Sequence, residues 1–272
     1  MKNYGKDLFK GTASYYAKYR PVYPPELVRF LVNRYSLDGT GRLLDLGCGT
    51  GQLTLRFADW FERITGIDPE EEMLIEAKRR SEDARIGHCE WIGGRAEDYV
   101  RSLSHDSIRL VMIAKAFHWM DQQTVLGQLY EAIAPGGGVA IIDAYHPGQQ
   151  LEPWQEETER IVKKWYGEER KAGNTVYAHP PISYEERMNQ SPFQTEVIHL
   201  PVHTVKWSIE SIIGNLYSTS CGRPVYVNEF KGAFEKDLHR ALQKLNEKNE
   251  FQEHIGLNLI LGMKEAEKRS KQ

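Results

Sequence analysis

The amino-acid sequence predicts an α/β protein built on a doubly wound parallel sheet. Between residues 43 and 143, apolar segments of strand length alternate with amphipathic helical segments, the order that builds such a sheet through right-handed crossovers. One apolar segment, residues 108–114, lacks polar alternation, as expected of a strand buried on both faces of a parallel sheet. A glycine-rich turn after the first strand indicates where a small ligand binds.

The first predicted strand, residues 43–46, leads directly into this turn, which has glycine at positions 47, 49 and 51. Glycine adopts positive φ angles and has no side chain, so the backbone can bend sharply and lie against a ligand. A helix predicted over residues 52–58 would turn its free N–H groups toward that ligand. A structural turn without a ligand is the alternative.

The spacing of the glycines and the acid before them narrow the class of ligand. Gly47, Gly49 and Gly51 give Gly-x-Gly-x-Gly, which differs from the Gly-x-Gly-x-x-Gly of dinucleotide binders, and no Gly-Lys-Ser/Thr of a phosphate loop follows. Asp45 stands just ahead of the turn, where its charge would repel a pyrophosphate. The same charge suits a ligand that carries an ammonium or sulfonium group.

The amino-acid composition indicates which kinds of partner and which cellular compartment to expect for this protein. The 272 residues allow one large domain or a domain with an insertion. Lys plus Arg is 35 and Asp plus Glu is 38, so the net charge of −3 gives no basic field for a nucleic acid. The cysteines, Cys48, Cys89 and Cys221, are far apart, which indicates a reducing compartment and no metal cluster. With no signal core or membrane-length apolar stretch, we expect a soluble, cytoplasmic monomer or homodimer.

Residues 1–35 precede the glycine strand and are rich in aromatic and basic side chains. Prolines interrupt this segment, and a helix is predicted from residue 26 to residue 35. One interpretation is an amphipathic arm packed on the core. The other is a lid whose Tyr15, Tyr19 and Arg20 close over the ligand, with a tyrosine face against a sulfonium and the guanidinium paired with a carboxylate.

The second strand, residues 63–68, ends in Asp68, and a helix is predicted from residue 71 to residue 81. An acid about twenty residues beyond the glycine turn, at the end of the next strand, is placed to accept hydrogen bonds from both hydroxyls of a ribose. The alternative is an acid that caps the following helix. Met73, one turn into that helix, would pack on an adenine or belong to the core.

The fourth strand, residues 108–114, ends in a loop that contains His118 and Trp119. Ligands bind beyond the carboxyl ends of parallel strands, so the reacting groups should meet at this loop. We expect Trp119 to wall an acceptor pocket and His118 to orient or deprotonate the acceptor. A buried histidine that only satisfies its hydrogen bonds is the alternative.

The C-terminal half has a less regular pattern. A helix is predicted over residues 152–171, followed by a strand over 195–207, helices over 209–218 and 227–248, and a last antiparallel strand over 256–264. The expected divisions are an N-terminal lid (1–35), a ligand-binding core (36–146), a helical insertion over the acceptor site (147–194) and a segment that completes the sheet (195–272).

The segment Asp45-Leu46-Gly47-Cys48-Gly49-Thr50-Gly51 resembles the first motif of the class I S-adenosylmethionine-dependent methyltransferases. Together with Tyr19-Arg20-Pro21, Asp68, Ala96-Glu97 and Phe117-His118-Trp119, it resembles the branch that includes the trans-aconitate methyltransferases. The resemblance is specific over residues 41–143 and loose in the C-terminal half. It implies a seven-stranded sheet whose last strand is antiparallel and S-adenosylmethionine as cofactor. We expect no metal site.

The resemblance also implies a set of cofactor-binding residues. Ala96 and Glu97 would lie beside the adenine, whose exocyclic amine needs an acceptor, with Asp98 as the competing acceptor. The full expected set is Tyr15, Tyr19, Arg20, Asp45, Gly47, Cys48, Gly49, Gly51, Asp68, Met73, Ala96, Glu97 and Ala114.

The expected activity is transfer of a methyl group to a small-molecule acceptor by in-line displacement, with His118 and Trp119 as candidate catalytic residues. One alternative is methylation of nucleic acid, although residues 114–117 do not show the Asn/Asp-Pro-Pro-Tyr/Phe loop of amino-methylating relatives. The other is a protein that binds the cofactor without catalysis, for which the acceptor pocket would be filled by side chains.

The sequence leaves two classes of acceptor open. Aromatic residues fit a flat or apolar molecule, and they are Trp119, Trp154, Trp165 and Tyr217. Basic residues fit an acid, and they are Arg20, Lys115 and Arg223.

Overall fold

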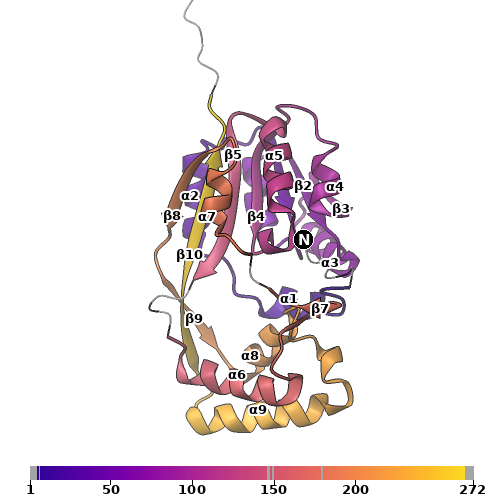
Figure 1. Ribbon diagram of the computed structural model, residues 1–272, viewed down its shortest axis with the longest axis vertical. Coiled ribbons are helices and arrows are strands. Elements are labelled where there is room, and N and C mark those ends of the chain that lie inside the picture. The colour runs from indigo at the N-terminus through magenta and orange to yellow at the C-terminus, as the bar shows by residue number, and fades with distance from the viewer. Residues whose placement is uncertain (1–4, 6, 146–147, 149, 179, 267–272) are drawn as a thin grey trace, which may run out of the picture.

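The computed structural model describes residues 5, 7–145, 148, 150–178 and 180–266. Within them, an eight-stranded sheet has the order β3-β2-β1-β4-β5-β10-β8, and β9 pairs with β10 beside this path (Figure 1). Its strands are β1 Arg42–Leu46, β2 Arg63–Asp68, β3 Cys89–Gly93, β4 Ile108–Ala114, β5 Ile133–Tyr145, β8 Gln194–His199, β9 His203–Trp207 and β10 Phe251–Met263.

The strand directions confirm the predicted fold class. Strands β1 to β5 run parallel to one another, and β10, the last strand in the described chain, runs antiparallel to β5, β8 and β9. Within the described residues the sheet has one strand more than the seven expected, because β9 extends it along β10.

The helices lie on both faces of the sheet and beyond its carboxyl ends. They are α1 Ala13–Tyr19, α2 Pro25–Arg34, α3 Glu71–Asp83, α4 Ala96–Val100, α5 Gln122–Ala132, α6 Pro153–Tyr166, α7 Tyr184–Asn189, α8 Ile209–Tyr217 and α9 Lys231–Leu245. Short 3-10 helices are η1 Thr54–Trp60, η2 Phe117–Trp119, η3 Pro224–Tyr226 and η4 Asn228–Phe230. None of the helices in the described residues is long and apolar enough to cross a membrane.

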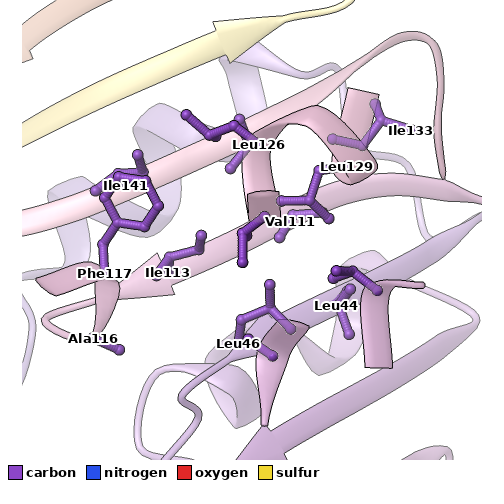
Figure 2. Packing of buried hydrophobic residues seen from close by; sticks show 14 of the residues in the cluster. Leu44, Leu46, Val111, Ile113, Ala116, Phe117, Leu126, Leu129, Ile133 and Ile141 are labelled. Carbon is purple, nitrogen blue, oxygen red and sulfur yellow. The ribbon is translucent and has the colours of Figure 1, made fainter. Parts of the chain in front are cut away.

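Both faces of the sheet are buried by apolar side chains. On one face, Leu44 and Leu46 of β1 and Val111 of β4 pack with Leu126 and Leu129 of α5 (Figure 2). The opposite face packs on α2 and η1 through a second set of fully buried residues, Leu27, Leu31, Leu43, Phe57 and Leu110. Burial on both faces explains why β4 carries almost no polar side chain.

A second group of elements packs around its own core, and we call it the C-terminal lobe: α6, α8, α9, β9 and residues 251–255 of β10. Its buried side chains include Ile161, Trp207, Tyr217 and Phe234. In Figure 1 the lobe lies beyond the carboxyl ends of the parallel strands, with α1 between the two. The single strand β10 pairs with β9 in the lobe and, from Gly256 onward, with β5 in the main sheet.

Several predicted elements differ from the structure. The helix expected after the glycine turn is the 3-10 helix η1. The strand expected over 195–207 is divided into β8 and β9, because Pro201 in the connection has no N–H to donate to a ladder. The helix expected over 152–171 ends at Tyr166, and the residues after it form a short hairpin, β6 Lys171–Ala172 and β7 Thr175–Val176, and also α7.

Strand β10 begins five residues earlier than expected. Glu253 hides the alternation of apolar residues there, because it is a charged residue that points inward. Its carboxylate is buried, where it accepts hydrogen bonds from Trp207 Nε1 (2.8 Å) and Gln155 Nε2 (2.9 Å). A buried acid paired with two side-chain donors cannot be distinguished from a surface acid by periodicity.

Candidate cofactor and acceptor cavities

The glycine turn is held between the ends of β1 and β2. The N–H groups of Gly47 and Cys48 both donate to the carbonyl of Ile67, at 2.8 and 3.1 Å. Gly47 has a φ of 75°, and a Cβ atom there would lie 2.4 Å from Cβ of Ala116. The turn therefore requires glycine at this position both for its backbone conformation and for the close approach of the loop after β4.

Asp68 joins the glycine turn to the start of α3. One carboxylate oxygen accepts from the N–H of Gly49 and the other from the N–H of Glu70, each at 2.9 Å. Burial raises the pKa of Asp68 to about 6, and these two hydrogen bonds oppose the rise. Each oxygen keeps a further lone pair for a ligand, so the cap and the ligand-binding interpretations of Asp68 are compatible.

Asp45 lies beneath the turn, and its side chain is buried. One oxygen accepts from the hydroxyl of Thr54 at the start of η1, while Oδ1 has no hydrogen-bond partner among the described residues. Burial raises the pKa of Asp45 to about 7. A buried carboxylate of this kind is costly when charged unless a cation faces it.

The first cavity, with a volume of about 680 Å³, opens at the carboxyl ends of β1, β2 and β4. Eight residues of the predicted site line it: Gly47, Gly49, Asp68, Met73, Ala96, Glu97, Ala114 and Trp119. Five others do not line either of the two cavities described here: Tyr15, Tyr19, Asp45, Cys48 and Gly51. The remaining two, Arg20 and His118, line a second cavity.

Glu97 already has partners in the protein. Its carboxylate accepts from the N–H of Asp121 at 2.7 Å and pairs with Arg95 at 3.3 Å. Burial acts to raise the pKa of Glu97, but these two partners outweigh it and hold the pKa below its ordinary value. The side chain thus ties the start of α4 to the loop after η2, at the wall of the first cavity.

The two faces of helix α1 contact different parts of the molecule. Tyr15 packs edge-on against Tyr217 at 5.2 Å between ring centroids, and Tyr19 donates its hydroxyl to Glu210 at 2.7 Å, so both contact the C-terminal lobe. Tyr16, on the opposite face, lines both cavities, and Arg20 one turn later lies over its ring at 4.9 Å. Tyr16 thus has the cavity-facing position that we expected for Tyr15 and Tyr19.

Residues 7–20 form a roof over the first cavity and are attached on two sides. On the core side, the N–H of Gly11 donates to Glu72 at 2.7 Å and Gln52 donates to the carbonyl of Arg20 at 3.3 Å. On the lobe side, Arg223 donates to the carbonyls of Asp7 and Lys10, at 2.7 and 3.1 Å. Of the predicted segment 1–35, residues 1–4 and 6 lie outside the described residues.

The second cavity, of about 580 Å³, adjoins the first. Four residues line both cavities: Phe9, Tyr16, Lys115 and Trp119. His118 lines the second cavity, and its ring centroid lies 4.4 Å from that of Trp119 and 5.7 Å from that of Tyr177. The junction between the cavities therefore has aromatic walls.

Lys115 stands at this junction in an unusual backbone conformation. Its φ is 53°, in the left-handed region, and its N–H donates to the carbonyl of Ile142 at 2.8 Å. Burial lowers the pKa of Lys115 to about 8, and the charge of Arg20 acts in the same direction. A strained backbone at the end of a central strand is typical of a functional position.

Sequence reasoning missed Tyr16, Arg170 and Tyr177 as cavity residues. Tyr16 stood among several aromatic residues without a periodicity to single it out. Arg170 and Tyr177 flank the β6–β7 hairpin, and a two-residue strand leaves almost no pattern in the sequence. No group of His, Cys, Asp or Glu side chains in the described residues is arranged to hold a metal ion.

Comparisons with known proteins show which domain and which fold the chain resembles. Residues 43–137 match a family described as a methyltransferase domain. An uncharacterized methyltransferase of Schizosaccharomyces pombe is 30% identical over 162 residues, which are 58% of this chain and 60% of that protein. A putative type II methyltransferase from Anaeromyxobacter dehalogenans has a TM-score of 0.56 at 21% identity, over 89% of this chain and 96% of that one. Phosphoethanolamine N-methyltransferase 2 of Haemonchus contortus has a TM-score of 0.54 at 16% identity, over 95% of this chain and 59% of that one.

Residues 43–137 therefore form a methyltransferase domain, and the fold of the chain is that of the class I S-adenosylmethionine-dependent methyltransferases. The matching domain covers β1 to β4 and the start of β5, with the glycine turn and Asp68. The chain spans about three fifths of the length of its S. pombe relative. The finer resemblance to trans-aconitate methyltransferases stays a prediction.

Proposed function

We propose that the chain transfers a methyl group from S-adenosylmethionine, bound in the first cavity, to a small molecule bound in the second. This proposal rests on two adjoining cavities that share an aromatic junction. The first of these cavities is formed by the glycine turn and Asp68. S-adenosylmethionine supplies a methyl group that is already activated by a sulfonium.

The residues of the first cavity fit such a cofactor. Asp68 has lone pairs for the two ribose hydroxyls, and Met73, beside it in the lining, offers an apolar surface for the adenine. The unpartnered carboxylate oxygen of Asp45, near the turn, supplies negative potential for an ammonium group. The tyrosine ring that suits the sulfonium is that of Tyr16, which stands at the junction.

The chain's own contribution to the reaction is exclusion of water and alignment. Phe9, Tyr16 and Trp119 surround the junction, where the acceptor atom, methyl carbon and sulfur have to come into line. Alignment of bound reactants lowers a barrier by about 7 to 11 kcal/mol. His118 lines the acceptor side, where a base is needed when the acceptor atom carries a proton.

The second cavity favours catalysis over cofactor binding alone. A non-catalytic binder has no need of an acceptor space, whereas here about 580 Å³ adjoins the cofactor cavity. A space of this size suits a small molecule. The H. contortus enzyme of the same fold has been solved with phosphomonomethylethanolamine and S-adenosylhomocysteine, a small acceptor together with the spent cofactor.

Calorimetric titration with S-adenosylhomocysteine tests the cofactor assignment, with NAD as the comparison ligand. We expect binding of S-adenosylhomocysteine that is selective over NAD and weakened about tenfold or more in Asp68→Ala, because hydrogen bonds to a charged group contribute about 1.5 to 3 kcal/mol each. Asp98→Ala is the matched control, since Asp98 is exposed and outside the cavity lining. Equal binding of NAD, or equal loss in both variants, would refute the assignment.

A further inference from the structure

The side chain of Lys115 stands where the two cavities meet and makes no hydrogen bond or ion pair with the described residues. Its Nζ atom lies 6.0 Å from the ring centroid of Tyr23. Asp143 also lines the second cavity, but its carboxylate accepts the N–H of Ala144 at 2.8 Å. Tyr16 and Tyr23 are uncharged, because burial raises the pKa of each. In the described chain, no anion thus holds a proton on Lys115 by a direct contact.

The charged groups around Lys115 come from several elements. Burial lowers the pKa of Lys115, and the permanent charge of Arg20, directly after α1, acts in the same direction. Asp143 of β5 and Glu253 of β10 act to raise it, but they are outweighed. His203 of β9 has a pKa lowered by burial, so it adds no charge above neutral pH. Lys115 therefore loses its proton at about pH 8, where an ordinary lysine is fully charged.

The backbone at Lys115 is costly for a lysine. Its φ of 53° lies in the left-handed region, which glycine adopts readily and residues with long side chains seldom do. The N–H of Lys115 donates to the carbonyl of Ile142 at 2.8 Å, which fixes this turn to the end of β5. Strain of this kind is typical of a position whose side chain is held for a function.

The cofactor proposed for the first cavity carries a positive charge of its own. A sulfonium at the junction lies beside Lys115, and two cations in a partly buried site repel each other. S-adenosylmethionine therefore binds best when Lys115 is a neutral amine. A neutral amine has a free lone pair and can accept a proton.

Resting on the proposed function, we propose that Lys115 is a catalytic base that removes the proton from a hydroxyl group of the acceptor as the methyl group is transferred. Lys115 lines both cavities, whereas His118 lines only the second of the two. A hydroxyl on an aromatic ring fits the aromatic walls of the junction. Its pKa of about 10 is close enough to that of Lys115 for the proton to be transferred.

The step conserves charge within the site. A lone pair of the hydroxyl oxygen forms the O–CH₃ bond, and the C–S bond breaks with its electron pair returning to sulfur. The O–H electron pair stays on oxygen, and the proton moves to Nζ of Lys115. One positive charge thus passes from the sulfonium to the Lys115 ammonium. Because the repulsion from sulfur fades as the methyl group leaves, the proton is held more strongly in the transition state than before it.

Arg20 and Arg170 support this step from the second cavity. Both guanidinium groups remain charged at every pH of interest and favour negative charge that develops on the acceptor oxygen. The same charges disfavour an acceptor that is itself a cation, such as a protonated amine. The cavity therefore favours a hydroxyl over an amino group as the methylated group.

The charge difference between S-adenosylmethionine and S-adenosylhomocysteine gives a test that needs no acceptor. The two ligands share their adenosine and amino-acid portions, so the titration of other groups largely cancels in the ratio of their dissociation constants. We expect the dissociation constant of S-adenosylmethionine, relative to that of S-adenosylhomocysteine, to fall about tenfold between about pH 6.5 and pH 9. Proton loss from Lys115 removes the repulsion over this range. Calorimetry at each pH measures both constants.

Substitutions of Lys115 should fix this ratio at opposite values. Lys115→Arg keeps a positive charge at every pH and should hold the ratio at its high, acidic value. Lys115→Asn removes the charge and suits the left-handed backbone, so it should hold the ratio at its low, alkaline value. Lys236→Gln, at an exposed lysine of α9, is the matched control and should keep the pH dependence of the unaltered chain.

Turnover is measured with methyl-labelled S-adenosylmethionine and a panel of one- and two-ring phenols, each paired with its nitro-substituted form. At about pH 8 the nitrophenols are ionised and need no base, whereas the parent phenols still carry their protons. Lys115→Asn should lower kcat about a hundredfold or more for a parent phenol and much less for its nitrophenol, because general-base catalysis contributes a factor of about 10² to 10⁴. A purely structural role of Lys115 would lower both equally.

Four results would overturn the inference: a ratio of dissociation constants that does not change with pH in the unaltered chain, a pH dependence that persists in Lys115→Asn and Lys115→Arg, an equal loss for both phenols of a pair, or no methylated phenol although S-adenosylmethionine binds. Failure of the proposed function is a different result, namely no binding of either S-adenosylmethionine or S-adenosylhomocysteine.

Discussion

At the scale of single residues, Asp45 shows how the site is built at a cost to the fold. Its carboxylate is buried, one oxygen bonds to Thr54, and the other has no partner in the described chain. Because burial raises the pKa to about 7, the folded state binds a proton more tightly than the unfolded chain. The stability that this proton contributes is complete below about pH 4 and is lost as the pH rises through about 7.

We therefore expect Asp45→Asn to stabilise the protein at about pH 8 by roughly 1 to 3 kcal/mol, since it removes a buried charge. Thermal unfolding followed by circular dichroism should show no such gain at about pH 4. The same variant should bind S-adenosylhomocysteine more weakly, because the negative potential near the turn is gone. Asp98→Asn, an exposed acid, serves as the control. A lower melting temperature for Asp45→Asn at pH 8 would contradict the argument.

At the scale of elements, the contact between α1 and α8 fixes the roof of the first cavity. Gly214 of α8 lies directly against the ring of Tyr19, and a Cβ atom there would be 2.2 Å from a ring carbon. The absence of a side chain at Gly214 thus allows Tyr19 to pack and to reach Glu210. This contact also sets which face of α1 turns Tyr16 toward the cavities.

Gly214→Ala should push α1 off the lobe and lower the free energy of unfolding by about 1 to 3 kcal/mol through overpacking. Trypsin cleavage after Lys18 should become faster, and the affinity for S-adenosylhomocysteine should fall. Gly232→Ala in α9 is the matched control, because a Cβ atom there meets nothing within 4 Å. Alanine in a helix is favoured over glycine, so that control should be neutral or stabilising. Slower cleavage of Gly214→Ala would refute this account of the roof.

The elements also differ in how well their sequences predict them. The strands β1, β2 and β4 and the glycine turn were predictable because their apolar runs and glycine spacing are local signals. The face that α1 turns toward the cavities was not predictable, because Tyr15, Tyr16 and Tyr19 place aromatic rings on more than one face of this seven-residue helix. Its orientation is set by tertiary contacts with Gly214 and Tyr217. These residues lie far from α1 in the sequence, so the local pattern around α1 does not reveal the contacts.

The cofactor side of the site was more predictable than the acceptor side for the same reason. Asp68 follows a strand directly, so its place in the cavity can be read from the chain. Arg170 stands just before the short β6–β7 hairpin and contacts Cys221, and its place at the second cavity depends on the whole fold.

At the scale of the whole molecule, the main sheet and the C-terminal lobe share one strand and should unfold together. Phe234 is completely buried in the lobe, 5.3 Å from the ring of Tyr166 and 6.2 Å from that of Tyr217. Phe234→Ala should cost about 3 to 5 kcal/mol and shift a single cooperative transition to lower temperature. Phe57→Ala, at a completely buried position beneath the main sheet, should shift the same transition by a similar amount.

Calorimetry together with circular dichroism checks this expectation. Coincident transitions in both variants are the expected result. A separate low-temperature transition in Phe234→Ala alone would mean that the lobe unfolds independently, and that β10 does not couple the two cores.

The position of β10 also dictates the order in which the sheet can be completed during synthesis. This strand lies between β5 and β8, yet it is the last of the three to leave the ribosome. Until β10 has emerged, residues 138–145 of β5 present a row of unpaired backbone N–H and C=O groups on the side that β10 later covers. The nascent chain therefore carries an open, aggregation-prone sheet edge from the completion of β5 until β10 has been made, and this thirteen-residue strand closes the core sheet and the lobe in one late, long-range step.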